Sequence, residues 1–143
     1  MIALRTATRD DIGAVLAFWS EATAEPSATD DADGLLALFD RAPDALVVAV
    51  DGDVAAHHGV VGTVIGGWDG WRGSLYRLAV APAHRRRGIA TALVHEAERR
   101  LFACGVRRMH LIVGRGGGAA AEQFWRAARY EPTDQMRMVK DLG

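Results

Sequence analysis

The segment Ser74–Val113 constrains the fold of this chain more than any other part of the sequence. A strand pattern at Ser74–Val80 leads into three consecutive arginines and Gly88, a long helical pattern follows, and a second strand pattern covers Met109–Val113. A connection of this kind between two strands of one sheet is right-handed, and the two strands then lie parallel. The segment therefore predicts a parallel strand pair with a helix packed against the sheet.

The remaining sequence predicts shorter elements that add antiparallel strands to the same sheet. Asp51-Gly52 is typical of a hairpin turn between two β-branched runs. Thr8 and Asp11 form a capping-box pattern, after which apolar residues recur at helical spacing. The predicted strands are Ile2–Thr6, Leu46–Val50, Val60–Ile65, Ser74–Val80, Met109–Val113 and Met136–Val139, and the predicted helices cover about residues 9–24 and 33–41, Ile89–Cys104 and Ala119–Ala128.

The length and composition favour one compact domain over residues 1–143. The chain has 143 residues, of which 50% are hydrophobic and 24% are charged, and it can bury a core without disulfide or metal support. The single cysteine, Cys104, excludes a disulfide framework and is expected to be a buried packing residue. No apolar run reaches the roughly 20 residues of a membrane helix, and the polar N-terminus does not resemble a signal peptide. The expected location is cytoplasmic.

Charge is distributed unevenly along the chain, although the formal net charge is only -1. Residues 1–71 contain three arginines and twelve acidic residues, whereas residues 72–108 contain nine arginines and two glutamates. An anionic ligand is therefore expected at residues 72–108, and a cationic one is favoured near residues 1–71. Nucleic acid fits poorly, because the acidic part would repel phosphates and no aromatic platform accompanies the arginines.

The turn before the helix that starts at Ile89 has the chemistry of an anion site. A helix N-terminus presents N–H groups without intrahelical acceptors at the positive end of the helix dipole. Gly88 allows a phosphate to approach the backbone closely, and Ala90 leaves the first turn uncrowded. A solvated arginine cluster before an ordinary helix explains the same residues equally well. Walker-type and dinucleotide-binding loops are disfavoured, because the residues and glycines that they need are missing from the turn.

A short motif connects the strand and the helix of this segment: Leu78-Ala79-Val80-Ala81-Pro82, then Arg85-Arg86-Arg87-Gly88-Ile89-Ala90. It resembles the acetyl-CoA signature Gln/Arg-x-x-Gly-x-Gly/Ala of the GNAT superfamily of N-acetyltransferases, and the order of elements agrees over nearly the whole chain. The stretch from Val61 to about Leu101 is similar to the small bacterial YpeA-type acetyltransferases, in comparison with which Ala55–Val60 is an insertion. The resemblance implies an α/β (α+β) GNAT fold: a mixed, mostly antiparallel sheet of about six to seven strands, helices on both faces, and a parallel strand pair that splays at the CoA site.

The resemblance also implies a site for acetyl-CoA that is made mainly of backbone. Amides of residues 86–91 would hold the CoA diphosphate, and main-chain groups of Leu78 and Val80 would pair with the pantetheine arm as an added strand. The arginine side chains would add attraction to the phosphates. The implied CoA-binding residues are Leu78, Val80, Arg85, Arg86, Arg87, Gly88, Ile89, Ala90 and Thr91.

Acetyl transfer to a primary amine requires that the ammonium form of the acceptor lose a proton. Tyr76 and Asp69 are the foremost candidates for the catalytic proton acceptor, and each also has a structural interpretation, as an aromatic packing residue on a strand and as a turn residue. His84, Glu21 and Glu25 are further candidates, and His84 is interpreted mainly as structural.

A general acid can protonate the departing thiolate, and in many members of the superfamily this acid is a Tyr on the last helix. Alignment on Ala121 and Phe124 places Trp125 at this position. An indole N–H can donate a hydrogen bond but does not release a proton, and Tyr130 lies about 140° further round a continuous helix. One general acid contributes typically ~10² to 10⁴ in rate, so activity without it is still expected.

These residues together predict an acetyl-CoA-dependent N-acetyltransferase that works by direct attack of a primary amine in a ternary complex, with no metal and no covalent acyl-enzyme. The alternative is a CoA-binding or acyl-CoA-binding protein whose weakened catalysis serves regulation or sensing. The expected acceptor is a small-molecule or peptide amine, cationic according to the charge of residues 1–71. Neither a membrane nor nucleic acid is an expected partner, and a homodimer agrees with the family.

Overall fold

A computed structural model describes residues 1–22, 27–114 and 118–142. These residues form two compact units, Met1–His110 and Leu111–Gly143. None of the described helices is long and apolar enough to cross a membrane. The first unit contains β1 (Ile2–Thr6), η1 (Arg9–Asp11), α1 (Ile12–Ala22), α2 (Ala32–Arg41), β2 (Leu46–Asp51), η2 (Ala56–Gly59), β3 (Val60–Trp68), β4 (Gly73–Val80), η3 (Pro82–His84), α3 (Ile89–Ala103) and β5 (Met109–His110), and the second unit contains α4 (Gly118–Ala127).

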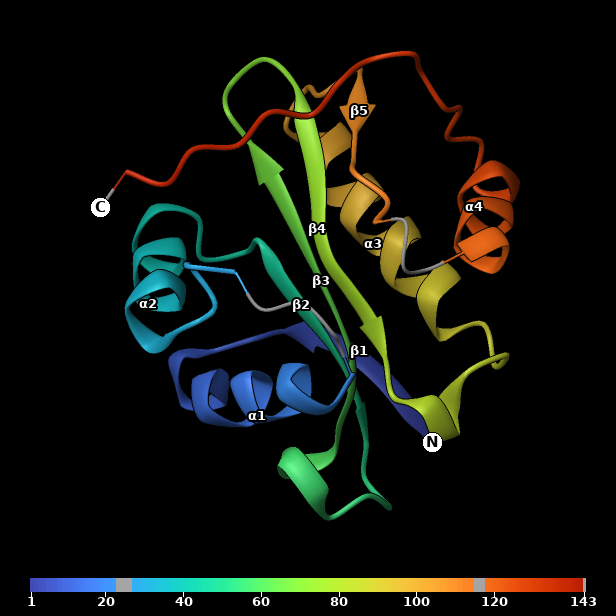
Figure 1. Cartoon of the computed structure of the whole chain (residues 1–143). Helices are drawn as coiled ribbons and strands as arrows, with labels where there is room; N and C mark the ends of the chain where they lie inside the picture. Colours follow the sequence, from blue (N-terminus) through green and yellow to red (C-terminus); the bar gives the residue numbers. More distant parts are fainter. Residues whose placement is uncertain (23–26, 115–117, 143) are drawn as a thin grey trace. The chain divides into compact units, whose positions relative to one another are not determined.

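The strands of the first unit lie in the sheet in sequence order, β1-β2-β3-β4-β5 (Figure 1). Strands β1 to β4 form an antiparallel meander. Strand β5 joins β4 in parallel after the α3 crossover. This topology confirms the parallel pair and the antiparallel meander predicted from the sequence, and it places the segment between β4 and α3 at one end of the sheet.

The two faces of the sheet are covered by different helices, α1 and α2 on one and α3 on the other (Figure 1). The Trp19 indole N–H of α1 donates to the hydroxyl of Thr63 on β3 at 2.9 Å. A Cβ added to Gly62, the preceding residue, would instead touch Leu93 and Ile89 of α3. Neighbouring strand residues point to opposite faces, so α1 and α3 pack on opposite sides, as predicted. The predicted apolar stripe of α3 is buried: Ile89, Leu93, Ala97 and Leu101.

The mixed sheet with helices on both faces agrees with the prediction, but the sheet is smaller than predicted. In the described residues it has five strands instead of about six to seven. Strand β5 contains only Met109–His110 of the predicted Met109–Val113, and the described segment Met136–Val139 forms no strand. Met136, Met138 and Val139 are exposed. Their alternating apolar pattern therefore covers no core.

The first helix begins at the predicted capping residues. The Thr8 N–H donates to the Asp11 carboxylate at 2.8 Å, and the Arg5 guanidinium donates to both of its oxygens at 2.7 and 2.9 Å. These contacts, with Arg5 as the largest cause, lower the pKa of Asp11 to about 2. The predicted helix over residues 9–24 is a 3-10 turn followed by α1, and its last two residues lie outside the described residues.

Candidate active site

The turn between η3 and α3 presents backbone N–H groups on an open surface. Gly88, the N-cap of α3, has a φ of 77°, and Arg86 has a φ of 64°. The Ala92 N–H donates to the Gly88 carbonyl at 3.0 Å, so the N–H groups of residues 89–91 precede the first acceptor within the helix. A Cβ added to Gly88 would meet nothing within 4 Å. The turn thus offers accessible donors at the positive end of the helix dipole, which suits a diphosphate.

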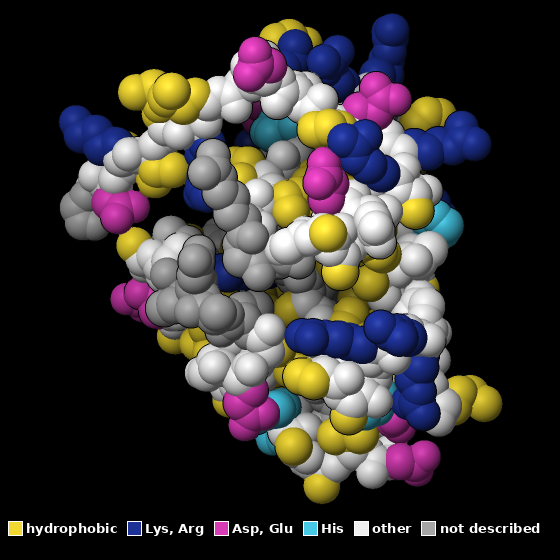
Figure 2. Space-filling model, turned by 45° about the vertical axis from the view of Figure 1, so that its right-hand side comes forward, with side chains coloured by type: hydrophobic (Ala, Val, Ile, Leu, Met, Phe, Trp, Pro, Cys, Tyr) yellow, Lys and Arg dark blue, Asp and Glu magenta, His cyan; other side chains and the backbone are white. Residues whose placement is uncertain are grey.

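The arginine run of this turn is exposed. Figure 2 shows a band of basic side chains across the lower half of the face turned forward, and further basic side chains in the upper part of that face. Arg85, Arg86 and Arg87 are all exposed, and the Arg85 Nε donates to the Val80 carbonyl at 3.4 Å. A hydrogen bond of this length is weak. A ligand that pairs with Val80 would therefore displace Arg85 at little cost in free energy.

Val80 stands at the free edge of β4. The Ala81 N–H donates to the Val61 carbonyl on β3 at 2.8 Å, and successive residues of a strand direct their backbone groups to opposite sides. The N–H and carbonyl of Val80 therefore point away from β3. In the described residues, β5 pairs with β4 only at Gly73 and Ser74. The edge from there to Val80 can receive an extended chain as an added strand.

Strand β4 contains a bulge at Arg77 and Leu78. These two residues stand opposite a single residue of β3, because the register shifts between Thr63 and Ile65. Arg77 has a φ of 52°, a left-handed conformation that costs a non-glycine residue about 1–2 kcal/mol. Contacts elsewhere in the fold must offset this cost.

A buried network holds the bulge. Thr63 is fully buried, and its hydroxyl donates to the Arg77 carbonyl at 2.8 Å while accepting the Trp19 indole N–H at 2.9 Å. The Arg77 guanidinium lies over the Trp19 ring, 5.6 Å from its centroid, and its Nε donates to the Asp30 carboxylate at 3.0 Å. Helix α1, the segment before α2 and strand β3 therefore all contribute to the backbone conformation beside Leu78.

The two foremost catalytic candidates have different surroundings. Asp69 Oδ1 accepts the N–H groups of Trp71 and Arg72, each at 2.8 Å. These bonds, that of Arg72 first, lower the pKa of Asp69, which makes its carboxylate a weaker proton acceptor and agrees with a turn role. The Tyr76 ring is half exposed and lies over Gly67, where an added Cβ would be 3.0 Å from the ring.

His110 is a candidate that the sequence reasoning missed. It is exposed on β5, and its Nε2 lies 2.9 Å from the hydroxyl oxygen of the buried Ser74. Nothing in the spacing of these residues links them, because they meet only through the parallel register of β4 and β5. Only a residue-by-residue alignment of the two predicted parallel strands places Ser74 opposite His110.

The other proposed proton acceptors have structural partners or lie outside the described residues. His84 Nε2 is 2.9 Å from Asp51 Oδ2, and this contact ties η3 to the end of β2, in agreement with a structural role. Glu21 Oε2 is 2.9 Å from Nε2 of His57, so the hairpin insertion around η2 is attached to the end of α1. Glu25 lies outside the described residues.

The second unit carries Trp125. Helix α4 ends at Ala127, and Arg129, with a φ of 69°, turns the chain so that the Tyr130 N–H donates to the Trp125 carbonyl at 2.9 Å. The Tyr130 ring therefore does not continue round a helix. It lies edge-on against the Trp125 ring, with centroids 5.3 Å apart.

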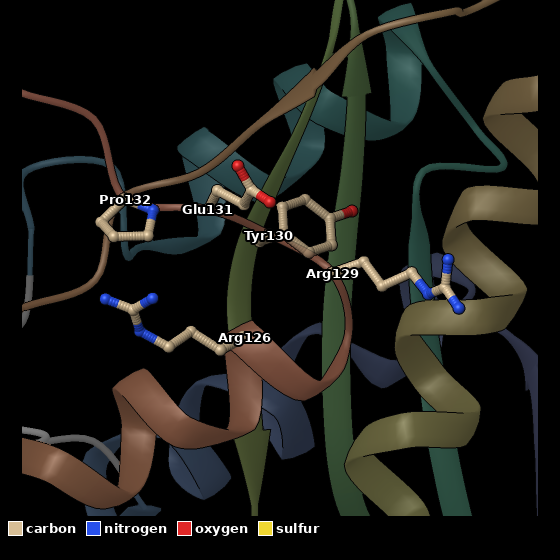
Figure 3. A pocket seen from close by; sticks show the side chains of 5 residues that line it. All are labelled: Arg126, Arg129, Tyr130, Glu131 and Pro132. Carbon is tan, nitrogen blue, oxygen red and sulfur yellow. The ribbon is translucent and has the colours of Figure 1, made fainter.

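A hollow of about 750 Å³ lies next to this aromatic pair, and Arg126 and Arg129 extend from it in opposite directions (Figure 3). It is lined by Arg126, Arg129, Tyr130, Glu131 and Pro132, none of which is a predicted CoA-binding residue.

Two further features concern reactive groups. Cys104 is exposed at the end of α3 instead of buried as expected, and the described residues contain no group of three or more His, Cys, Asp or Glu side chains that could hold a metal ion.

Comparison with known proteins identifies the family. Residues 13–128 match the acetyltransferase (GNAT) family, and the chain therefore belongs to this family of N-acetyltransferases. It is similar to an acetyltransferase from Pectobacterium atrosepticum, with 34% identity over 140 residues that cover 97% of this chain and 94% of the relative.

Two solved structures show the same fold with CoA present. A chain of the NatC complex bound to Gag peptide and CoA has a TM-score of 0.76 and 18% identity, over 89% of this chain and 82% of that chain. The PaiA N-acetyltransferase of Thermoplasma acidophilum, in complex with coenzyme A, has a TM-score of 0.70 and 16% identity, over 89% of this chain and 88% of that chain. At this level of identity the similarity shows the fold alone.

Proposed function

We propose that this protein is an acetyl-CoA-dependent N-acetyltransferase that acetylates a primary amine by direct attack in a ternary complex. The observation that carries the proposal is the free edge of β4, which leads at Val80 into the open N-terminal turn of α3. The edge offers an N–H and a carbonyl to the peptide-like pantetheine arm, and the turn offers donors to the diphosphate. The CoA present in the two solved relatives supports this choice of ligand.

Each predicted CoA-binding residue has a role that suits its exposure. Main-chain groups of Leu78 and Val80 would hold the pantetheine arm. Backbone amides of residues 86–91 would hold the diphosphate, and Ile89 would contribute only its backbone because its side chain is buried. The side chains of Arg85, Arg86 and Arg87 would attract the phosphates through space, an effect that salt screens.

Acetyl transfer from a thioester requires a neutral amine as the nucleophile and a stable leaving group. Acetyl-CoA supplies the acetyl group as a thioester, and a thiol with a pKa near 8.5 leaves as a tolerable thiolate. The family pattern assigns the usual general-acid position to Trp125, whose indole can donate a hydrogen bond without giving up a proton. The sequence predicts Tyr76 and Asp69 as proton acceptors, and the lowered pKa of Asp69 makes its carboxylate the weaker acceptor and favours other groups near the β4 edge.

Thermal unfolding of the purified protein with acetyl-CoA, CoA, ATP and NAD in parallel tests the ligand. A ligand at a hundredfold excess over its dissociation constant stabilises a protein by about 2.7 kcal/mol, or several degrees for a domain of this size. A rise in Tm with both CoA species and not with ATP or NAD supports the proposal. No rise with either CoA species contradicts it, and an equal rise with ATP would assign the turn to nucleotides in general.

Thiol release from acetyl-CoA then tests the acceptor. The charge of residues 1–71 favours a cationic amine, so spermidine and glucosamine should be acetylated faster than glutamate or aspartate. Preference for the acidic amino acids would contradict the charge argument. Tight acetyl-CoA binding without thiol release on any amine would favour the sensing function over the enzyme.

A further inference from the structure

His110 and Ser74 form a hydrogen-bonded pair at the closed end of the β4–β5 ladder. Their Nε2 and Oγ atoms lie 2.9 Å apart. Ser74 is 7% exposed and His110 is exposed, so the hydroxyl is fixed within the fold while the ring faces solvent. In the described residues the ladder ends with this pair, and the free edge of β4 begins directly after it (Figure 1).

The proposed binding mode of acetyl-CoA, on which this inference rests, directs the thioester toward the pair. With the diphosphate at Gly88, the pantetheine arm runs back along the edge of β4 past Val80. Its acetyl end then points to the N-terminal half of β4, where Ser74 and Tyr76 lie on the same face of the sheet because they are two residues apart. An amine that approaches this end of the edge has the imidazole of His110 as a neighbouring nitrogen base.

The groups around His110 suit a ring that gains a positive charge. Tyr76 follows Ser74 by two residues on β4, and the carboxylate of Asp69, in the turn between β3 and β4, interacts electrostatically with His110. Arg107 and Arg108 precede His110 on its own segment, and both are exposed to solvent. Because the Asp69 carboxylate is held ionised by two backbone N–H groups, it is a fixed anion that stabilises an imidazolium.

We propose that His110 is the proton acceptor of the acetyl transfer and that Ser74 is its positioning residue. In the tautomer whose Nε2–H donates to Ser74, Nδ1 has a free lone pair, which takes a proton from the acceptor ammonium. The neutral amine nitrogen attacks the carbonyl carbon of acetyl-CoA, an N–C bond forms and the C–S bond breaks. The second proton of the amine ends on the CoA sulfur, and His110 returns its own proton to water.

His110→Gln tests the proposal, with His95→Gln as its matched control because His95 is exposed on α3. Calorimetry should show unchanged acetyl-CoA affinity in both variants, since neither side chain belongs to the proposed CoA site. Thiol release should fall ~10² to 10⁴-fold in His110→Gln and stay unchanged in His95→Gln. The probe is spermidine, or water as the slow acceptor if spermidine is not acetylated.

A pH profile and the ring tautomer separate proton transfer from a structural role. Wild-type turnover should decline as the pH is lowered, because a protonated ring has no lone pair to accept a proton, and His110→Gln should lose this decline. Nitrogen NMR of the histidine rings should show the Nε2–H tautomer of His110 in the wild type and a tautomer mixture in Ser74→Ala. Acetyl-CoA should shift the His110 ring signals and leave those of His95 in place.

The outcomes distinguish this inference from the proposed function. If the wild-type protein binds no acetyl-CoA, the proposed function itself is wrong. Wild-type protein that binds and releases thiol, together with His110→Gln of equal rate and pH profile, overturns only the role of His110. Lost acetyl-CoA affinity in His110→Gln also overturns it, because the residue then contributes to binding. If neither spermidine nor water accepts the acetyl group, the NMR experiment decides. His110 ring signals that do not shift when acetyl-CoA is added would then overturn the role of His110.

Discussion

The turn before α3 and the bulge of β4 lie at the same free strand edge, but the protein holds them in different ways. The turn is formed by exposed residues, with left-handed backbone at Arg86 and Gly88 and open space above Gly88. The bulge has left-handed backbone at Arg77, and buried partners from α1 and β3 fix it. A ligand reaches the turn directly, whereas a buried hydrogen-bond network shapes the bulge. Cofactor affinity and turnover should therefore depend on separable residues.

Gly88→Trp should have the largest effect, and it should act on acetyl-CoA binding. The side chain would project from a residue with a φ of 77° into the open space where the diphosphate is proposed to meet the backbone. Acetyl-CoA affinity measured by calorimetry should fall at least ~100-fold, or about 2.8 kcal/mol. The bulge network is untouched, so circular dichroism should show the same fold.

Gly105→Trp is the matched control for this variant. Gly105 follows α3 at its other end, has a φ of 97° and has no neighbour within 4 Å of an added Cβ. Both substitutions bring a comparable backbone cost of about 1–2 kcal/mol, but only the one at Gly88 blocks the proposed site. Equal losses of affinity would assign the effect to strain at the helix ends and would remove the turn from the binding site.

Thr63→Val should disturb the bulge of β4 and leave the turn before α3 unchanged. Valine keeps the shape but leaves the Trp19 N–H without its acceptor and the Arg77 carbonyl without its donor in a buried setting. The free energy of unfolding should fall by about 1–3 kcal/mol in urea titrations. Because the bulge changes and the α3 turn does not, kcat should fall by a larger factor than acetyl-CoA affinity.

Thr63→Ser provides the rescue for that substitution, since it restores the hydroxyl and removes only a methyl group. It should recover kcat while giving up about 1 kcal/mol of stability to the small cavity. If Thr63→Val is less stable but turns over at the wild-type rate, the network serves folding alone and the bulge does not set the catalytic geometry.

The difference between the two regions also explains what could be predicted from the sequence. The turn is local: the strand end, Gly88 and the apolar stripe of α3 are adjacent in the chain, and their roles follow from helix geometry. The bulge depends on Thr63 and Asp30, which lie 14 and 47 residues from Arg77 in the sequence. A register shift of this kind leaves no periodic pattern to detect, so the network could not be predicted.

The same reasoning applies to the elements that were predicted incorrectly or missed. The alternation at Met136–Val139 predicts a strand, but a strand also needs a partner edge and a core to cover, and these residues are exposed. The Ser74–His110 pair exists only through the parallel register of β4 and β5. Local patterns therefore predict which elements form, and the partners that they meet across the sheet decide the details of the site.

Arg86→Glu should have the smallest effect on acetyl-CoA binding. If backbone amides hold the diphosphate and the exposed Arg86 side chain only attracts it through space, charge reversal should weaken acetyl-CoA binding by about fivefold or less, within ~1 kcal/mol. Raising the salt from 0.1 M to 1 M shortens the Debye length from about 10 Å to about 3 Å, so calorimetry should find the difference from wild type nearly gone at 1 M. A loss that persists at high salt would mean that the guanidinium bonds the phosphates directly, and the turn would then depend on side chains much as the bulge does.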